Sequence, residues 1–100
     1  MDSKTFNEET SAQIKRSVDV LCTKAAEYAT EDRLHNFKVA AELEQIPATQ
    51  ALAGMMAKHT VSVYDMCKSG KEYPLALWEE KITDHINYLL LLNALIRDKG

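Results

Sequence analysis

The chain has 100 residues, 46% of them hydrophobic and 27% charged, which is enough for one compact core and excludes a disordered composition. It carries 12 basic and 15 acidic residues, and the resulting net charge of −3 argues against nonspecific DNA binding, which relies on clustered positive charge. Three Gly and two Pro are too few for a β-sandwich with many tight turns. We therefore expect a single domain over residues 1–100.

The first predicted helix extends from about residue 7 to about residue 30. Thr5 and Asn7 compete as its N-terminal cap, and Glu8 lies three residues after Thr5, as in a capping box. Behind them, apolar residues recur at steps of three and four and share one helical stripe: Ile14, Val18, Leu21, Ala25 and Tyr28. This pattern is typical of an amphipathic helix.

A short second helix is predicted from about Arg33 to Gln45. Asp32 is its expected cap, and Phe37 is expected in the core. The helix should end before Pro47, because the residue that precedes a proline avoids helical geometry.

The third predicted helix begins with Thr49 as its cap and ends at Gly70, because glycine suits the left-handed position after a helix. Its apolar side consists of Leu52, Met55, Met56, His59, Val63 and Met66. The fourth helix has Pro74 in its first turn and runs to about Arg97. Its apolar side consists of Trp78, Ile82, Ile86, Leu89, Leu92 and Ile96. No segment alternates with a period of two for long enough to be a strand, so the sequence predicts an all-α fold, a small four-helix bundle.

Four consecutive leucines, 89–92, point around the whole circumference of the fourth helix and need cover on every side. A homodimer that packs this segment between two subunits provides that cover, and the alternative is a central helix wrapped by the other three. No apolar run has the length of a membrane span, and the N-terminus has no signal-peptide pattern. Cys22 and Cys67 fit reduced, half-buried thiols, so we expect a cytoplasmic protein without a membrane partner.

Polar residues form a second pattern on the third and fourth helices. The loop between these helices is short, so they should pack antiparallel, and facing residues should have a nearly constant number sum. Three polar pairs sum to 145 or 146: Asp65 with Glu80, Ser62 with Asp84, and Lys58 with Asn87. Neighbouring carboxylates repel unless a cation neutralises them, and Mg²⁺ prefers carboxylate oxygens, so the stripes are compatible with a magnesium site. Spacing alone favours the alternative, an ordinary solvated face of charged side chains.

The order of several short motifs resembles a known family. The motifs are KAAEYA at 24–29, Asn36-Phe37, Lys58-His59 with Ser62 and Asp65-Met66, WEEKI at 78–82 with Asp84, and Asn87-Tyr88-Leu89. They span about residues 20–97 and resemble small helical proteins of phages and prophages that are similar to the all-α nucleotide pyrophosphohydrolase superfamily, the MazG-like fold. The resemblance implies an oligomeric four-helix core that uses Mg²⁺ to hydrolyse nucleoside triphosphates to monophosphate and pyrophosphate.

The same resemblance implies roles for individual residues. Glu80 and Asp84 would be the catalytic carboxylates that hold Mg²⁺, with Asp65 as a third ligand. The residues that would bind the nucleotide are Lys58 and Lys81, which meet phosphate charge, and Asn36 and Asn87. The superfamily's hallmark is two carboxylates three apart on one helix and an acidic pair three apart on the next. Here Glu80 and Asp84 are four apart, and the third helix has no Glu pair.

This departure keeps a second interpretation open, namely a noncatalytic helical interaction or adaptor protein of phage or prophage origin. The leucine run supports that interpretation, because exposed apolar patches usually mark interfaces. A cleft lined by Glu80, Asp84 and Asp65 would favour nucleotide binding, whereas exposure of these residues to solvent would favour the adaptor.

Overall fold

The computed structural model describes residues 1–27 and 32–98, and the side chains of 24–27 lie outside its description. Within these ranges the chain forms four helices and no strand: α1 (Ser3–Glu27), α2 (His35–Glu44), α3 (Ala48–Lys68) and α4 (Leu75–Arg97). The predicted all-α fold and its four helices are thus confirmed. The expected end of the first helix near residue 30, Tyr28 and the side chain of Ala25 fall outside the described residues.

Helix α1 begins four residues earlier than expected, because a different residue caps it. The Oδ1 atom of Asp2 accepts a hydrogen bond of 2.8 Å from the backbone N–H of Thr5, so neither Thr5 nor Asn7 is the cap. This hydrogen bond from Thr5 holds the pKa of the Asp2 carboxyl below its usual range. The carboxylate also lies at the positive end of the helix dipole, where a negative charge is favourable.

The starts of the other three helices also differ from the sequence prediction. Pro47 is the cap residue of α3, with φ −61° and ψ 148°, and Thr49 lies inside the first turn, so the cap assigned to Thr49 was wrong. Pro47 suits this place because its fixed φ fits the helix entry and it has no N–H to satisfy. Pro74 likewise precedes α4 instead of lying in its first turn. Asp32 stabilises the turn before α2, where its Oδ1 accepts a hydrogen bond of 2.9 Å from the N–H of Leu34.

Two residues adopt left-handed backbone geometry, and each follows a helix. Gly70 has φ +73° after α3, as the sequence predicted. Gln45 has φ +57° after α2, and the next N–H, that of Ile46, donates a 3.0 Å bond to the carbonyl of Ala41. This 6→1 bond closes a Schellman motif around a non-glycine residue.

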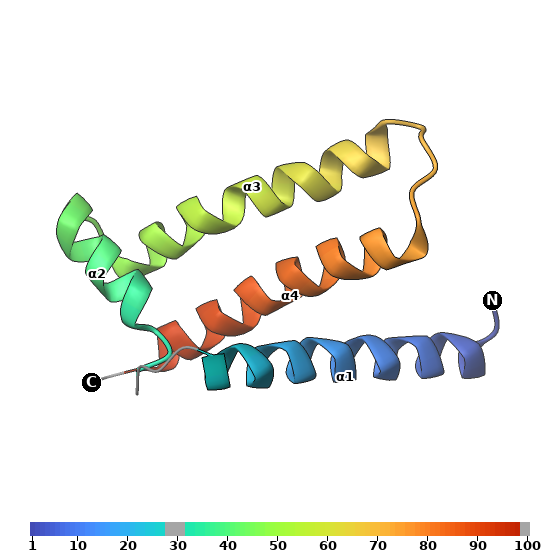
Figure 1. The fold of residues 1–100 in the computed structure, drawn as a ribbon, viewed down its shortest axis with the longest axis horizontal. Helices are drawn as coiled ribbons and strands as arrows, with labels where there is room; N and C mark the ends of the chain where they lie inside the picture. The colour runs from blue at the N-terminus through green and yellow to red at the C-terminus, as the bar shows by residue number, and fades with distance from the viewer. Residues whose placement is uncertain (28–31, 99–100) are drawn as a thin grey trace.

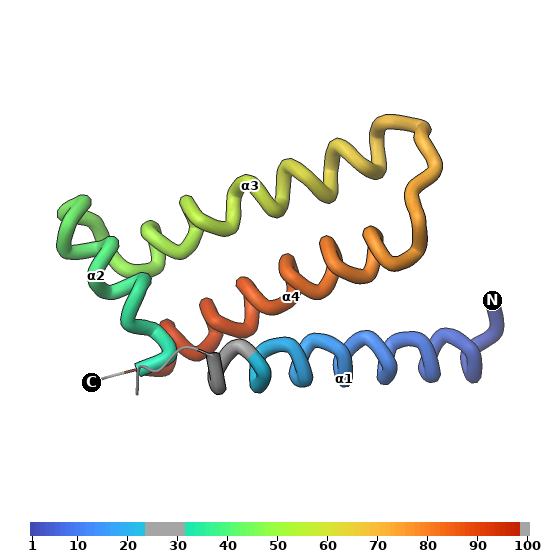
Figure 2. The backbone as a smooth tube through the Cα atoms, in the orientation of Figure 1, coloured from blue at the N-terminus to red at the C-terminus, as the bar shows by residue number. Residues whose placement is uncertain are grey.

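The three long helices lie side by side with α4 in the middle (Figure 1). Helices α3 and α4 form an antiparallel hairpin, and α1 lies along the opposite side of α4 and runs parallel to it (Figures 1 and 2). Over their described residues α1 and α3 do not contact each other, because α4 separates them. The short helix α2 packs on α3, at the end of the hairpin where α4 finishes.

The hydrophobic core lies at that end of the molecule. Its buried members are Leu34, Phe37, Leu52 and Leu95, which confirms the expected burial of Phe37. The leucine run of α4 is divided, since Leu91 and Leu92 pack against this core whereas Leu89 and Leu90 are exposed. Both cysteines are free and exposed, so the expected half-burial was wrong. Cys67 directly follows the buried Met66, and about 100° of helical rotation turns its side chain outward.

The contact between α1 and α4 is polar. Ser17 is completely buried, and the Nε2 atom of Gln13 donates hydrogen bonds of 3.2 Å to Ser17 Oγ and 2.9 Å to Thr83 Oγ1. Ile14 and Val18, which belong to the apolar stripe of this helix, are exposed. The part of the apolar stripe formed by Ile14 and Val18 therefore points away from its own chain.

No helix among the described residues combines the length and the apolar character needed to cross a membrane.

Candidate functional site

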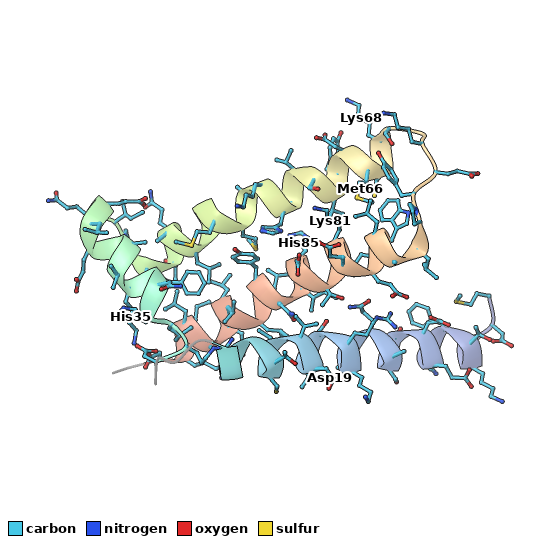
Figure 3. The ribbon with its side chains drawn as sticks, in the orientation of Figure 1. Asp19, His35, Met66, Lys68, Lys81 and His85 are labelled. Carbon is cyan, nitrogen blue, oxygen red and sulfur yellow. The ribbon has the colours of Figure 1, made fainter. Side chains whose placement is uncertain are left out.

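The candidate site lies along the hairpin of α3 and α4, whose register two contacts define. The Oγ1 atom of Thr60 lies 2.9 Å from Nε2 of His85, and the rings of His59 and Tyr88 are 4.8 Å apart between centroids. The paired residue numbers sum to 145 and 147, as expected for the predicted antiparallel packing. Lys81 and His85 lie between the two helices (Figure 3).

The three predicted metal-binding carboxylates do not form a closed cluster. Asp84 is half-buried, whereas Asp65 and Glu80 are exposed. Within the described part of the chain, no group of three or more His, Cys, Asp or Glu side chains could hold a metal ion. Asp65 precedes the buried Met66, so a rotation of about 100° along the helix turns it toward solvent. Glu80 and Asp84 still share one face of α4, because they are one turn apart.

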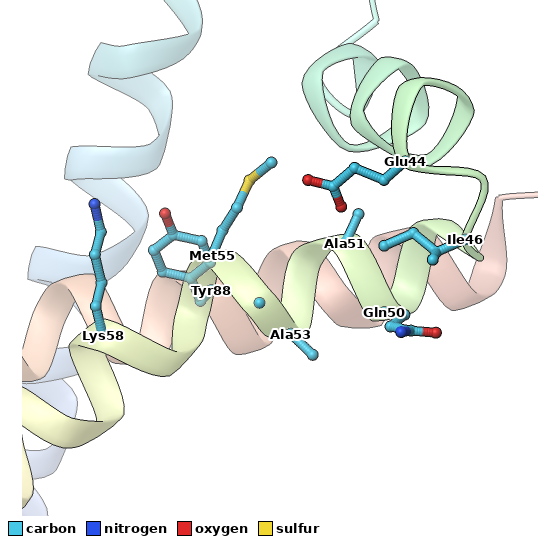
Figure 4. A pocket seen from close by; sticks show the side chains of 9 residues that line it. Glu44, Ile46, Gln50, Ala51, Ala53, Met55, Lys58 and Tyr88 are labelled. Carbon is cyan, nitrogen blue, oxygen red and sulfur yellow. The ribbon is translucent and has the colours of Figure 1, made fainter.

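Lys58 lines an open pocket of about 930 Å³ beside the hairpin. In Figure 4 the side chains of Lys58, Met55 and Tyr88 rise on the same side of α3, and the carboxylate of Glu44 at the end of α2 approaches from across the pocket. Three small residues of α3 also line the pocket, namely Ala51, Ala53 and Gly54. Its volume lies in the range of small-molecule sites.

Tyr88 is a pocket residue to which the sequence assigned no role in the site. The predicted apolar stripe of α4 omits it, although it begins an apolar segment that extends to Leu92 and belongs to a motif of the family resemblance. The signal was present in the register, because His59 and Tyr88 have a number sum close to that of the polar pairs. Asp84 lies one turn before Tyr88 on the same face of α4, so the carboxylate stripe leads toward the pocket.

The two predicted asparagines do not join this pocket. Asn36 is exposed near the start of α2. Asn87 is only 6% exposed, and it follows Thr83 by one turn on the side of α4 that meets α1. Lys58 therefore lines the pocket without Asn87, and the residue of α4 that lines it is Tyr88. Within the described chain, neither side-chain polar atom of Asn87 has a hydrogen-bond partner.

The pocket thus combines a cation, a carboxylate, a phenol ring, a flexible thioether and small residues of α3. A lysine ammonium is a mobile point charge that can meet a phosphate, and an aromatic face can stack on a flat ring. Comparison with family models, with curated proteins and with solved structures gives no match for this chain.

Proposed function

We propose that this protein is a MazG-like nucleotide-binding protein that receives its ligand in the pocket of Lys58 and Tyr88. The observation that carries the proposal is that these two side chains line one pocket while Asp84 lies a single helical turn away. In this arrangement Lys58 meets the phosphates, and the ring of Tyr88, held against His59, supports the base.

In this proposal, Mg²⁺ binds to the protein together with the nucleotide. The donor set of the chain is two carboxylates one turn apart, Glu80 and Asp84, and no larger acidic group is present in the described residues. Such a set suits Mg²⁺, which commonly takes one or two protein carboxylates, substrate phosphates and several waters. When bound there, the ion would neutralise phosphate charge and support pyrophosphate release by water, the reaction that the family resemblance implies.

Calorimetric titration of nucleoside triphosphates tests the pocket. Replacement of Lys58 by Ala should weaken binding at least about tenfold, because a charge-assisted hydrogen bond is lost. Lys68→Ala is the matched control, since it removes the same charge from the last turn of the same helix, outside the pocket. Equal effects of the two substitutions, or no nucleotide binding by the wild type, would refute the proposal.

A second titration separates binding from catalysis. Asp84→Asn should abolish the gain in affinity that Mg²⁺ gives and leave the metal-free affinity unchanged, because it removes charge without removing the pocket. Pyrophosphate release is followed in the same samples. Release by the wild type that is lost in Asp84→Asn would identify a pyrophosphohydrolase, and binding without release would identify a nucleotide sensor.

A noncatalytic helical interaction protein is the second candidate. The exposure of Asp65 and Glu80, together with the lack of a three-residue metal group in the described chain, favours it. Neither binding nor pyrophosphate release in the two titrations would select this candidate over nucleotide binding.

A further inference from the structure

We infer that a second copy of this chain covers an apolar face formed jointly by α1 and α4. We define this apolar face by Ile14 and Val18 of α1 and by Ile82, Ile86 and Leu89 of α4. All but the half-buried Ile86 are exposed in the single chain. The inference does not depend on nucleotide binding, because the pocket of Lys58 contains none of these residues.

Helical geometry puts both stripes on the same side of the molecule. Ser17 points toward α4, and Ile14 and Val18 lie roughly 60° and 100° around α1 from it. Thr83 of α4 points toward α1. Ile86 and Ile82 lie roughly 60° and 100° from Thr83 around the axis of α4, in the direction opposite to that from Ser17 to Ile14 and Val18 on α1. Because the two helices run parallel (Figure 1), these opposite rotations turn both stripes to one side.

The face has the composition of an interface core. On α4, the positions Ile82, Ile86, Leu89, Asn93 and Ile96 recur at steps of four and three without a charged residue. On α1, a similar uncharged series with steps of four and three consists of Thr10, Ile14, Val18 and Leu21. Depletion of charge is the compositional feature that distinguishes the buried centre of an interface from the rest of a surface.

The chain exposes more surface than a compact monomer, and the excess is similar to the area that each subunit buries in a homodimer. The accessible surface is 7386 Å², whereas a compact monomer of 11.3 kDa should expose about 5,700 Å². The excess of roughly 1,700 Å² matches what each subunit buries in an obligate homodimer, roughly 1,000–2,500 Å². The radius of gyration agrees, at 15.7 Å against about 13 Å for a compact chain of this length.

A twofold dimer would also bury the apolar side that α1 and α4 leave exposed in the single chain. A twofold axis presents the same patch on both copies, so α1 and α4 of one copy meet α1 and α4 of its partner. Four long helices then surround one apolar centre, which is the arrangement of a four-helix bundle. Ile14 and Val18 of α1, which their own chain leaves exposed, become part of that centre.

Sedimentation equilibrium tests the inference. The wild type should be a dimer at about 100 μM, and Val18→Glu and Leu89→Glu should each raise the dimer dissociation constant at least about 100-fold, since every dimer receives two buried charges. Leu43→Glu is the matched control, because Leu43 is 80% exposed on α2 and lies outside the apolar face. That control should change the constant by less than about threefold. A monomeric wild type, or a dimer that both face variants leave intact, would overturn the inference.

Wild-type protein gives a second test that no folding defect can affect. In a dimer mixed from isotope-labelled and unlabelled chains, isotope-filtered NMR should show intermolecular contacts from the methyl groups of Ile14, Val18, Ile82 and Leu89. A dimer without contacts from these methyl groups would assign the interface elsewhere and refute the apolar face.

Discussion

Thr60 and His85 connect the two arms of the hairpin through a hydrogen bond of 2.9 Å between Oγ1 and Nε2. This bond lies beside the tilted ring pair of His59 and Tyr88, so the residues that set the register of α3 and α4 adjoin those that line the pocket. The geometry of the candidate site therefore depends on the packing of the hairpin.

Replacement of Thr60 by Val should loosen this hairpin. The change keeps the shape of the side chain and removes the hydroxyl, so the free energy of unfolding should fall by about 0.5–1 kcal/mol. Urea denaturation measures the loss. Thr49→Val is a suitable control, because Thr49 is an exposed threonine of the same helix, and its effect should be the smaller of the two.

Reciprocal substitutions at the two left-handed positions should have opposite effects. Gly70→Ala should lower the free energy of unfolding by about 1 kcal/mol, since the added Cβ meets no atom and the cost is that of the backbone alone. Gln45→Gly should raise it by about 0.5 kcal/mol, because it relieves the left-handed strain after α2.

Gly54→Ala is the control for this pair. Gly54 lies inside α3 with open space around it, so alanine should stabilise the helix by about 0.5–1 kcal/mol. Thermal unfolding of the three variants would test the assignments, and a stabilised Gly70→Ala variant would contradict the left-handed conformation.

Asn87→Leu should stabilise the protein. Within the described chain, the buried amide of Asn87 has no hydrogen-bond partner, and an apolar side chain of similar size removes that cost. We expect the free energy of unfolding to rise by about 1–2 kcal/mol, measured by denaturant titration. A fall in the free energy of unfolding by a similar amount would mean that the amide of Asn87 has hydrogen-bond partners in solution. If nucleotide affinity fell as well, the predicted role of Asn87 in nucleotide binding would be supported.

The connection between α2 and the end of α4 should be sensitive to acid. Lys38 Nζ lies 2.8 Å from Asp32 and 2.7 Å from Asp98. The hydrogen bond from Lys38, followed by that from the backbone of Leu34, lowers the pKa of Asp32 below its ordinary value of 3.8. A carboxyl whose folded pKa is depressed stabilises the fold above its unfolded pKa, and this contribution is lost as the pH falls from about 3.8 through the lower folded value.

Removal of the lysine should flatten this dependence. Urea midpoints measured from neutral pH down to about pH 2.5 should fall less steeply below pH 4 in Lys38→Met than in the wild type. Lys15→Met is the control, because Lys15 makes an exposed pair with Asp19 at 3.2 Å on α1. Parallel curves for wild type and Lys38→Met would contradict the role of this contact.

The sequence predicted those parts of the fold that depend on local geometry. Gly70 marked a helix end because few other residues tolerate a positive φ, and the short loop before Pro74 made α3 and α4 antiparallel. The same reasoning could not find Gln45, since a polar residue in the left-handed region has no compositional signature. Thr49 looked like a cap, but Pro47 occupies that role through its backbone.

The candidate site was only partly predictable, because helical spacing defines a stripe but not the direction in which it points. Spacing put Glu80 and Asp84 on one face, and it could not show that Asp65 turns to solvent beside a buried methionine. Helix α1 shows the opposite case. The hidden face is polar, with Ser17 at its centre, so the apolar stripe gave no indication of the neighbour within the chain.

The parallel pairing of α1 with α4 has a consequence for the order of folding. Gln13 and Thr83, which join these helices, are 70 residues apart, whereas Thr60 and His85 within the hairpin are 25 residues apart. During synthesis α1 emerges before its partner helix α4, which is made roughly 4–14 s later at ordinary translation rates. The nascent chain carries α1 as an unpaired amphipathic helix for that interval, so the hairpin can form as soon as α4 is complete, and α1 then docks on it.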